Sequence, residues 1–235
     1  MSAFKQRFRL WFRLWNPAFS NITKHDNCWF CLWNPTTNSL SRNLGFLNYH
    51  LRLTFGHDAL NDIYKVVAFS ANKVKVFSLS DNFWRDIPSF PIVPFNLHRI
   101  YCRPMVDNGV YVSGTINWLA IRDKTNYNWN DITIEQFLIV SFDLATETYQ
   151  QLLPPSGFVE VPPIEPSVTV LMDCLCFSHR FRGTHFVIWK MMEFRVQESW
   201  TQFLKISFQN LHIDRGISDP LAYRSQLFLL PLCVS

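Results

Sequence analysis

The sequence predicts an all-β protein, an incomplete kelch-like β-propeller of about four antiparallel meander repeats. The 235 residues include 22 Phe, 9 Trp and 7 Tyr, whereas only 17% are charged and 7 are Gly. Such a composition suits pleated, half-buried sheet surfaces better than charged helices. A strand-turn-strand unit recurs four times along the chain, and further strand signals precede three of its copies.

The recurring unit is an apolar, β-rich run, a polar turn, and an aromatic or aliphatic residue that opens a second short run. In each copy the residue before the turn and the anchor residue after it are six positions apart: Asn34 and Leu40, Ser78 and Trp84, Asp143 and Tyr149, and Phe194 and Trp200. The four anchors recur at close to the period of about 40 to 50 residues that propeller blades show, with one longer interval.

Strand signals rich in Val, Ile, Tyr, Phe and Trp lie upstream of the last three copies, at residues 62–70, 108–121 and 172–181. Each repeat is therefore expected to be a small antiparallel meander. One meander cannot bury both of its faces, so neighbouring meanders must stack, with their polar turns at the rims. A β-sandwich with accidental spacing is the alternative.

The connections at 88–108, 122–134, 154–167 and 209–223 carry Pro, Asn and Asp without alternation and are expected to be loops. Partners usually bind at loops on a rigid scaffold, and aromatic and Arg side chains dominate binding hot spots. The predicted partner-binding residues are therefore Trp129, Phe158, Arg180 and Arg182. Ordinary half-buried loop packing is the alternative for each of the four.

Residues 1–27 form a distinct basic and aromatic segment. Lys5, Arg9 and Arg13 recur every four positions, and aromatic residues follow the same helical spacing. A membrane-surface helix or a transit peptide would have this pattern. The alternative is a duplicated strand end or a fused exon remnant, because the sequence LWNP is found at both 14–17 and 32–35.

Composition argues against several classes of protein. The net charge of +4 is modest and the basic residues are spread along the chain, so we expect no nucleic-acid partner. No apolar stretch reaches the roughly 20 residues that span a bilayer. The six cysteines, without a secretory signal, are expected to be reduced, in an intracellular protein of the cytoplasm or nucleus.

No pattern in the chain points to catalysis, a cofactor or a metal site. Nucleophile-elbow, phosphate-loop and zinc-protease signatures are missing. Cys28 and Cys31 have the spacing of half a zinc site but lack a second pair. His179 and His185 flank a turn between two strand signals without a third ligand nearby. Carboxylates such as Asp58 are expected in turns, where they bond backbone N–H groups.

Cys174 and Cys176 are two positions apart in an apolar run. On a strand this spacing directs both side chains to one face, which favours core packing.

Ordered motifs over about residues 28 to 213 resemble the F-box-associated interaction domain of plant F-box proteins, in its kelch-related branch. The residues that carry the resemblance are CLWNPTTNSLSRNLG, FGHDALNDIYKVVAF, VKVFSLSDNFWRDI, NGVYVSGTINWLAI, IVSFDLATETYQQLLPP and ESWTQFLKI. Within them stand a WNP turn, a GxD before YKVV, an NGxxxxGxxxWL strand and an SFDL-to-Tyr hairpin.

The resemblance implies a domain, here residues 28–235, that recruits an unknown target protein to an SCF-type ubiquitin ligase. In the family an N-terminal F-box binds the SCF adaptor. The segment before residue 28 does not resemble an F-box, and the chain stops where family members continue. The resemblance therefore does not extend to adaptor binding, and we expect the propeller to be truncated at its C-terminal end. An adaptor-free target-binding protein, a non-functional truncated gene copy and a propeller enzyme are the alternatives.

Overall fold

The computed structural model describes residues 9–13, 27–34, 37–40, 46–48, 51–95, 97, 109–122 and 128–210. For residues 9–13, 27–34, 40, 46–48 and 210 it describes the backbone alone. Apart from short 3-10 turns, all regular structure in these ranges is β-strand, which confirms the predicted fold class.

The first sheet is organised around one central strand, β2 (Asn27–Asn34). Strand β1 (Arg9–Arg13) pairs with one edge of β2. The short strands β3 (Ser39–Leu40) and β4 (Phe46–Asn48) pair with opposite ends of its other edge. A helix, one alternative for the N-terminal segment, is therefore wrong for residues 9–13, and residues 14–17 lie outside the described residues.

The other three sheets are simple antiparallel meanders in which each strand pairs with its neighbours in the sequence, as predicted. The second sheet contains β5 (Arg52–Asp58), β6 (Ile63–Phe69), β7 (Val74–Ser78) and β8 (Phe83–Ile87). The third contains β9 (Val110–Val112), β10 (Thr115–Ile121), β11 (Phe137–Asp143) and β12 (Tyr149–Leu152). The fourth contains β13 (Ser167–Leu171), β14 (Cys174–Phe181), β15 (His185–Met191) and β16 (Trp200–Ser207).

Short 3-10 turns punctuate the connections. They are η1 (Trp129–Asp131), η2 (Ile134–Gln136), η3 (Gln197–Ser199) and η4 (Phe208–Asn210).

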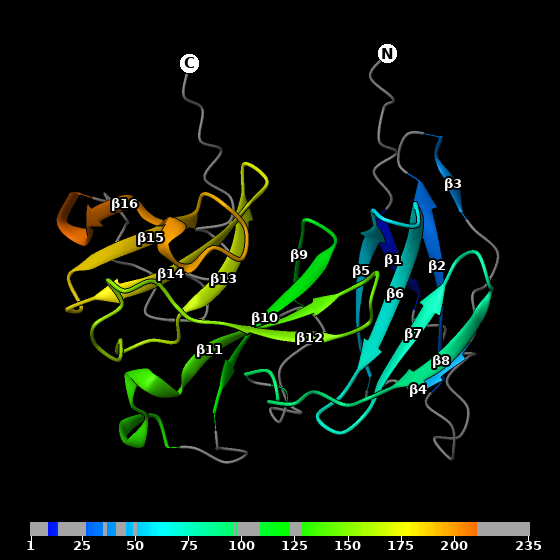
Figure 1. The fold of residues 1–235 in the computed structure, drawn as a ribbon, viewed down its shortest axis with the longest axis horizontal. Coiled ribbons are helices and arrows are strands. Elements are labelled where there is room, and N and C mark those ends of the chain that lie inside the picture. Colours follow the sequence, from blue (N-terminus) through cyan, green and yellow to red (C-terminus); the bar gives the residue numbers. More distant parts are fainter. Residues whose placement is uncertain are drawn as a thin grey trace, which may run out of the picture.

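The second, third and fourth sheets follow one another in space as well as in sequence (Figure 1). Strand β13 contacts β9, and β10 contacts β5, so successive sheets meet near their first strands. Blades around a propeller axis meet in this way, whereas a sandwich would lay two sheets face to face. Over the described residues, the architecture is that of an incomplete β-propeller with four sheets.

The predicted six-residue repeat corresponds to one type of hairpin in the first three sheets. Leu40 pairs with Trp33, Trp84 with Phe77, and Tyr149 with Phe142. Two residues before each anchor the backbone turns left-handed, with φ of 51° at Asn38, 58° at Asn82 and 55° at Glu147. A residue in this region is what closes a tight turn, and Asn adopts it readily.

The fourth copy departs from the repeat. Trp200 pairs with Met191, the last residue of β15, so the anchor was placed correctly. Phe194, however, lies in a longer connection that contains η3. Its equivalence to Asp143 is wrong, and the six-residue spacing in this copy is a coincidence.

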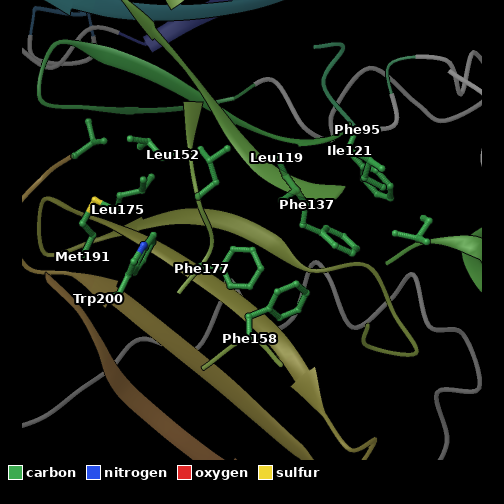
Figure 2. Close-up of a cluster of buried hydrophobic side chains, with 13 residues drawn as sticks. Phe95, Leu119, Ile121, Phe137, Leu152, Phe158, Leu175, Phe177, Met191 and Trp200 are labelled. Atoms are coloured by element: carbon green, nitrogen blue, oxygen red, sulfur yellow. The ribbon is translucent and has the colours of Figure 1, made fainter. Parts of the chain in front are cut away.

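The core lies between the sheets, with the third sheet in the middle. Every residue of β10 is buried. Ile116, Trp118 and Ala120 belong to a cluster with the second sheet. Leu119 and Ile121 belong to a cluster with the fourth sheet, shown in Figure 2. The strand therefore serves two interfaces, and the sheet depends on both neighbours.

Replacing Phe177 by Ala is expected to destabilise the whole domain. The side chain is 0% exposed and its ring lies 5.0 Å from that of Phe158, so the change leaves a cavity between sheets. We expect a loss of about 3 to 5 kcal/mol in the free energy of unfolding, measured by urea denaturation. Phe83→Ala, at a position 52% exposed, should cost about 0.5 kcal/mol. Equal losses would contradict this description of the core.

Candidate functional site

A buried ion network joins the second sheet to the third. Lys65 Nζ lies 3.1 Å from Asp58 Oδ2 and 3.1 Å from Glu147 Oε1, and it donates a hydrogen bond to the carbonyl oxygen of Leu144. Arg85 Nη2 donates to the same Glu147 oxygen at 2.6 Å. The Asp58 side chain is 0% exposed and that of Lys65 is 6% exposed. Because Asp58, Lys65 and Arg85 come from one sheet and Glu147 from the next, the network fixes their relative position.

Asp58 also closes the turn between β5 and β6. Its Oδ1 accepts from the backbone N–H groups of Leu60 and Asn61, each at 3.1 Å, and Oδ2 accepts from the Asn61 amide at 2.9 Å. Burial alone would raise the pKa of Asp58, but the hydrogen bonds from Asn61 and Lys65 hold it below its ordinary value. Buried charges are tolerated only when they are satisfied in this way.

A close approach of the backbone completes this contact between the second and third sheets, which we call the first joint. A Cβ atom on Gly56 would lie 2.5 Å from Leu144 Cδ1 and 2.6 Å from Tyr111 Cδ2, so only glycine fits without displacing them. The Tyr111 hydroxyl donates to the carbonyl oxygen of His57 at 2.8 Å. The GxD and YKVV motifs thus meet the SFDL hairpin, and their residues hold sheets together.

The third and fourth sheets are joined by a second set of polar contacts. Arg195 Nη2 lies 3.0 Å from Asp143 Oδ2. Burial would raise the pKa of Asp143, but the backbone N–H groups of Thr146 and Ala145, together with Arg195, lower it. The Trp200 indole donates to the carbonyl oxygen of Leu153 at 3.2 Å. Trp200 is also a member of the apolar cluster in Figure 2.

The loop between the third and fourth sheets packs on the fourth sheet around His179. The rings of Phe158 and His179 are 5.1 Å apart, edge to face. A Cβ on Gly157 would overlap the Trp189 ring, so the loop backbone rests directly on the indole. Trp189 Nε1 in turn donates to His179 Nε2 at 3.3 Å. The loop is therefore a fixed part of the domain.

Two of the predicted partner-binding residues, Trp129 and Phe158, are engaged in packing. The indole of Trp129 is half-buried and donates to the carbonyl oxygen of Pro162 at 2.8 Å. Phe158 is 3% exposed and lies between Phe137 and Phe177 (Figure 2). Because so little of its surface is exposed, Phe158 fits the alternative of ordinary loop packing. A partner-binding role for either residue remains a prediction.

The two predicted arginines lie together at the turn between β14 and β15. Arg180 is half-buried with its Cζ 4.5 Å from the centre of the Phe208 ring. Arg182 is exposed, with its Cζ 5.1 Å from the Phe181 ring. The structure adds an exposed Lys205, whose Nζ lies 4.4 Å from the same ring. Lys205 was missed because only the β15–β16 pairing brings it there.

The groups considered for metal or thiol chemistry are placed as follows. In the described ranges no group of three His, Cys, Asp or Glu side chains could hold a metal ion. Cys174 and Cys176 are free thiols on β14; Cys176 is buried, and burial raises its pKa to about 11. His179 and His185 lie on paired strands.

None of the helical segments described is long and apolar enough to cross a membrane.

Removing the buried carboxylate at the first joint should destabilise the domain more than removing an exposed one. Asp58→Asn leaves Lys65 buried with one carboxylate partner fewer, at an expected cost of about 3 kcal/mol in urea denaturation. Asp86, 66% exposed and 3.3 Å from Lys75, supplies the matched control in the same sheet. Asp86→Asn should cost less than about 1 kcal/mol. Similar costs would show that the network contributes nothing beyond a surface pair.

Stability should fall in mild acid because of His179. Burial lowers its pKa below 6.5, although the Arg180 carbonyl and the Glu160 charge act in the opposite sense. Its Nδ1 lies 3.2 Å from the Arg180 carbonyl oxygen and therefore carries the proton, leaving Nε2 to accept from Trp189. The unfolded chain binds a proton more readily, so the contribution is full above pH 6.5 and declines below it.

The measurement is the urea midpoint at about pH 7.5 and about pH 5, for the wild type and for His179→Gln. The variant, which cannot be protonated at this position, should lose less stability between the two conditions than the wild type. An equal loss would assign the pH dependence to other groups.

Comparison with known proteins identifies relatives of the chain. A family model described as the F-box associated beta propeller domain matches residues 19–228. The chain is 29% identical to F-box protein CPR1 of Arabidopsis thaliana over 185 residues, 69% of this chain and 41% of that protein. It is 30% identical to F-box protein At1g11270 over 60% of this chain and 41% of that protein. It is 26% identical to the putative F-box protein At1g33530 over 79% and 39%.

These alignments span about two fifths of the length of the curated relatives. The family match, by contrast, covers most of the chain and includes all the described strands from β2 onward. The GxD, YKVV and SFDL motifs quoted from the sequence lie where the second sheet meets the third. The chain therefore belongs to the family of F-box associated beta propeller domains.

Proposed function

We propose that this chain is a target-recognition module of an SCF-type ubiquitin ligase, which binds the protein to be ubiquitinated and performs no catalysis itself. The observation that carries the proposal is the family match over residues 19–228, together with relatives that are named F-box proteins. We place the chain in the cytoplasm or nucleus, because SCF-type ligases bind their targets in these compartments.

The distribution of polar groups supports binding as the mode of action. The least exposed of the ion-paired carboxylates in the described residues, Asp58, Glu147 and Asp143, lie at contacts between sheets, where each already binds a cation. A glycosidase or hydrolase would instead collect acids or metal ligands at an open site. These acids are therefore committed to holding the scaffold.

Exposed apolar side chains also favour a binding role. Leu60 is 80% exposed, Met172 is 75% exposed and Met192 is 59% exposed, and all three lie in connections between strands. Exposed apolar side chains at the ends of a rigid β scaffold are suited to contact with another protein.

The proposal is tested by capture of proteins from Arabidopsis extract on the immobilised full chain, with proteasome inhibition, followed by mass spectrometry. A defined set of proteins and their ubiquitin conjugates should be enriched on the wild type. Phe177→Ala, which has almost the same surface composition but a disrupted core, is the control and should lose that set. Identical recovery on both chains would refute folded-domain recognition. Recovery of targets without the SCF adaptor would favour an adaptor-free target-binding protein.

A further inference from the structure

We propose that the end of the fourth sheet around Arg180, Arg182 and Lys205 binds an acidic peptide segment of the target protein. This inference rests on the proposed function, since it specifies the chemistry of the partner. We call this surface the basic end of the fourth sheet. It also contains two half-buried phenylalanines, Phe181 and Phe208.

The fold brings these five residues to one end of the fourth sheet, where Arg180 and Phe181, consecutive on β14, point to opposite faces. Residues 180 to 182 are consecutive, at the end of β14 and the start of the turn. Ser207 pairs with His185, directly after this turn. The backbone N–H of Phe208 donates to the carbonyl oxygen of Thr184 at 3.0 Å, which holds that residue against the turn. The basic end is therefore built on hydrogen-bonded backbone from three strands.

The cations of the basic end differ from the structural cations of this fold. Lys65, Arg85 and Arg195 are each paired with a carboxylate at a sheet joint. Arg182 and Lys205 instead both contact the Phe181 ring, with Arg182 Cζ 5.1 Å and Lys205 Nζ 4.4 Å from its centre. Within the part of the chain that the structure describes, no ion pair is found for either of them or for Arg180.

The carboxylate of Glu160 lies near the basic end, where it binds the backbone and not a cation. Glu160 Oε1 accepts a hydrogen bond from the backbone N–H of Arg182, so this contact leaves the guanidinium itself unpaired. The contact also ties the 154–166 loop to the turn. The basic end thus keeps an excess of positive charge beside an ordered loop.

Charge complementarity identifies the occupant. Cations that are held over phenyl rings pay less conformational entropy on binding than free side chains, and their guanidinium and ammonium groups still point donors outward. Carboxylates are the partners that such donors recognise, with Arg favouring paired oxygens. Phenyl faces between the cations accommodate apolar residues interspersed with the acids. Nucleic acid would call for a longer row of cations that follows successive phosphates.

The test measures binding of the full chain to a fluorescein-labelled peptide in which Glu and Asp alternate with Val and Ser, by fluorescence anisotropy. The matched probe carries Gln and Asn at the acidic positions. We expect the acidic peptide to bind, the amide peptide to bind about tenfold more weakly, and the affinity to fall as salt is raised. Failure of the wild type to bind, or equal binding of both peptides, would overturn the proposal.

Two double variants assign the binding to the basic end. Arg182→Ser with Lys205→Ser should weaken acidic-peptide binding about tenfold. Lys73→Ser with Arg122→Ser removes the same charge at exposed positions of the second and third sheets and should change the affinity less than about twofold. Arg182→Lys with Lys205→Arg should retain binding. Near-UV circular dichroism of every variant should match the wild type, and equal weakening by both double variants would overturn the assignment.

Two further measurements, binding of a uridine oligonucleotide and capture of targets from extract, separate the remaining possibilities. Tighter binding of the oligonucleotide than of the acidic peptide would overturn the peptide assignment. If the wild type captures targets from extract and the Arg182→Ser, Lys205→Ser chain captures them equally, the basic end is excluded while target recognition stands. If every protein captured by the wild type is also captured by Phe177→Ala, target recognition itself fails.

Discussion

The structure depends on the need of the third sheet to cover two apolar faces. Strand β10 is buried along its whole length because its alternate side chains enter two different clusters. Burial of this kind is non-directional and would hold the sheets together in many relative positions. The polar joints select one of them, since Lys65 reaches both Asp58 and Glu147 only when the second and third sheets are in register.

This arrangement separates the residues that build the scaffold from those available to a partner. Four motif residues make contacts between sheets and are not available to a partner: Gly56, Asp58, Lys65 and Asp143. At the far end of the fourth sheet, Arg182 and Lys205 rest on a phenyl ring and remain exposed. The same residue types therefore stabilise the fold in one place and offer recognition chemistry in another, according to whether a carboxylate reaches them.

The sequence was sufficient for the strands and hairpins because their signals are local. Alternation and turn residues such as Asn82 act within a few positions, so the meanders, the four anchors and three of the four residues before the turns were predicted. Contacts between sheets were not predictable in this way. Asp58 was recognised only as a turn acid because its network depends on Glu147, far along the chain. Phe158 looked accessible in a Pro-rich loop, and it is buried because that loop folds back onto His179.

The central claim is that the joints make the second, third and fourth sheets one cooperative unit. Native-state hydrogen exchange under increasing denaturant tests it most directly, because it gives an opening free energy for each strand. The account predicts that the amides of β6, β10, β11 and β14 converge on a single opening free energy with a shared denaturant dependence. Exchange of β6 at a separate, lower free energy than β10 and β11 would contradict it, because the second sheet would then open without disturbing the third.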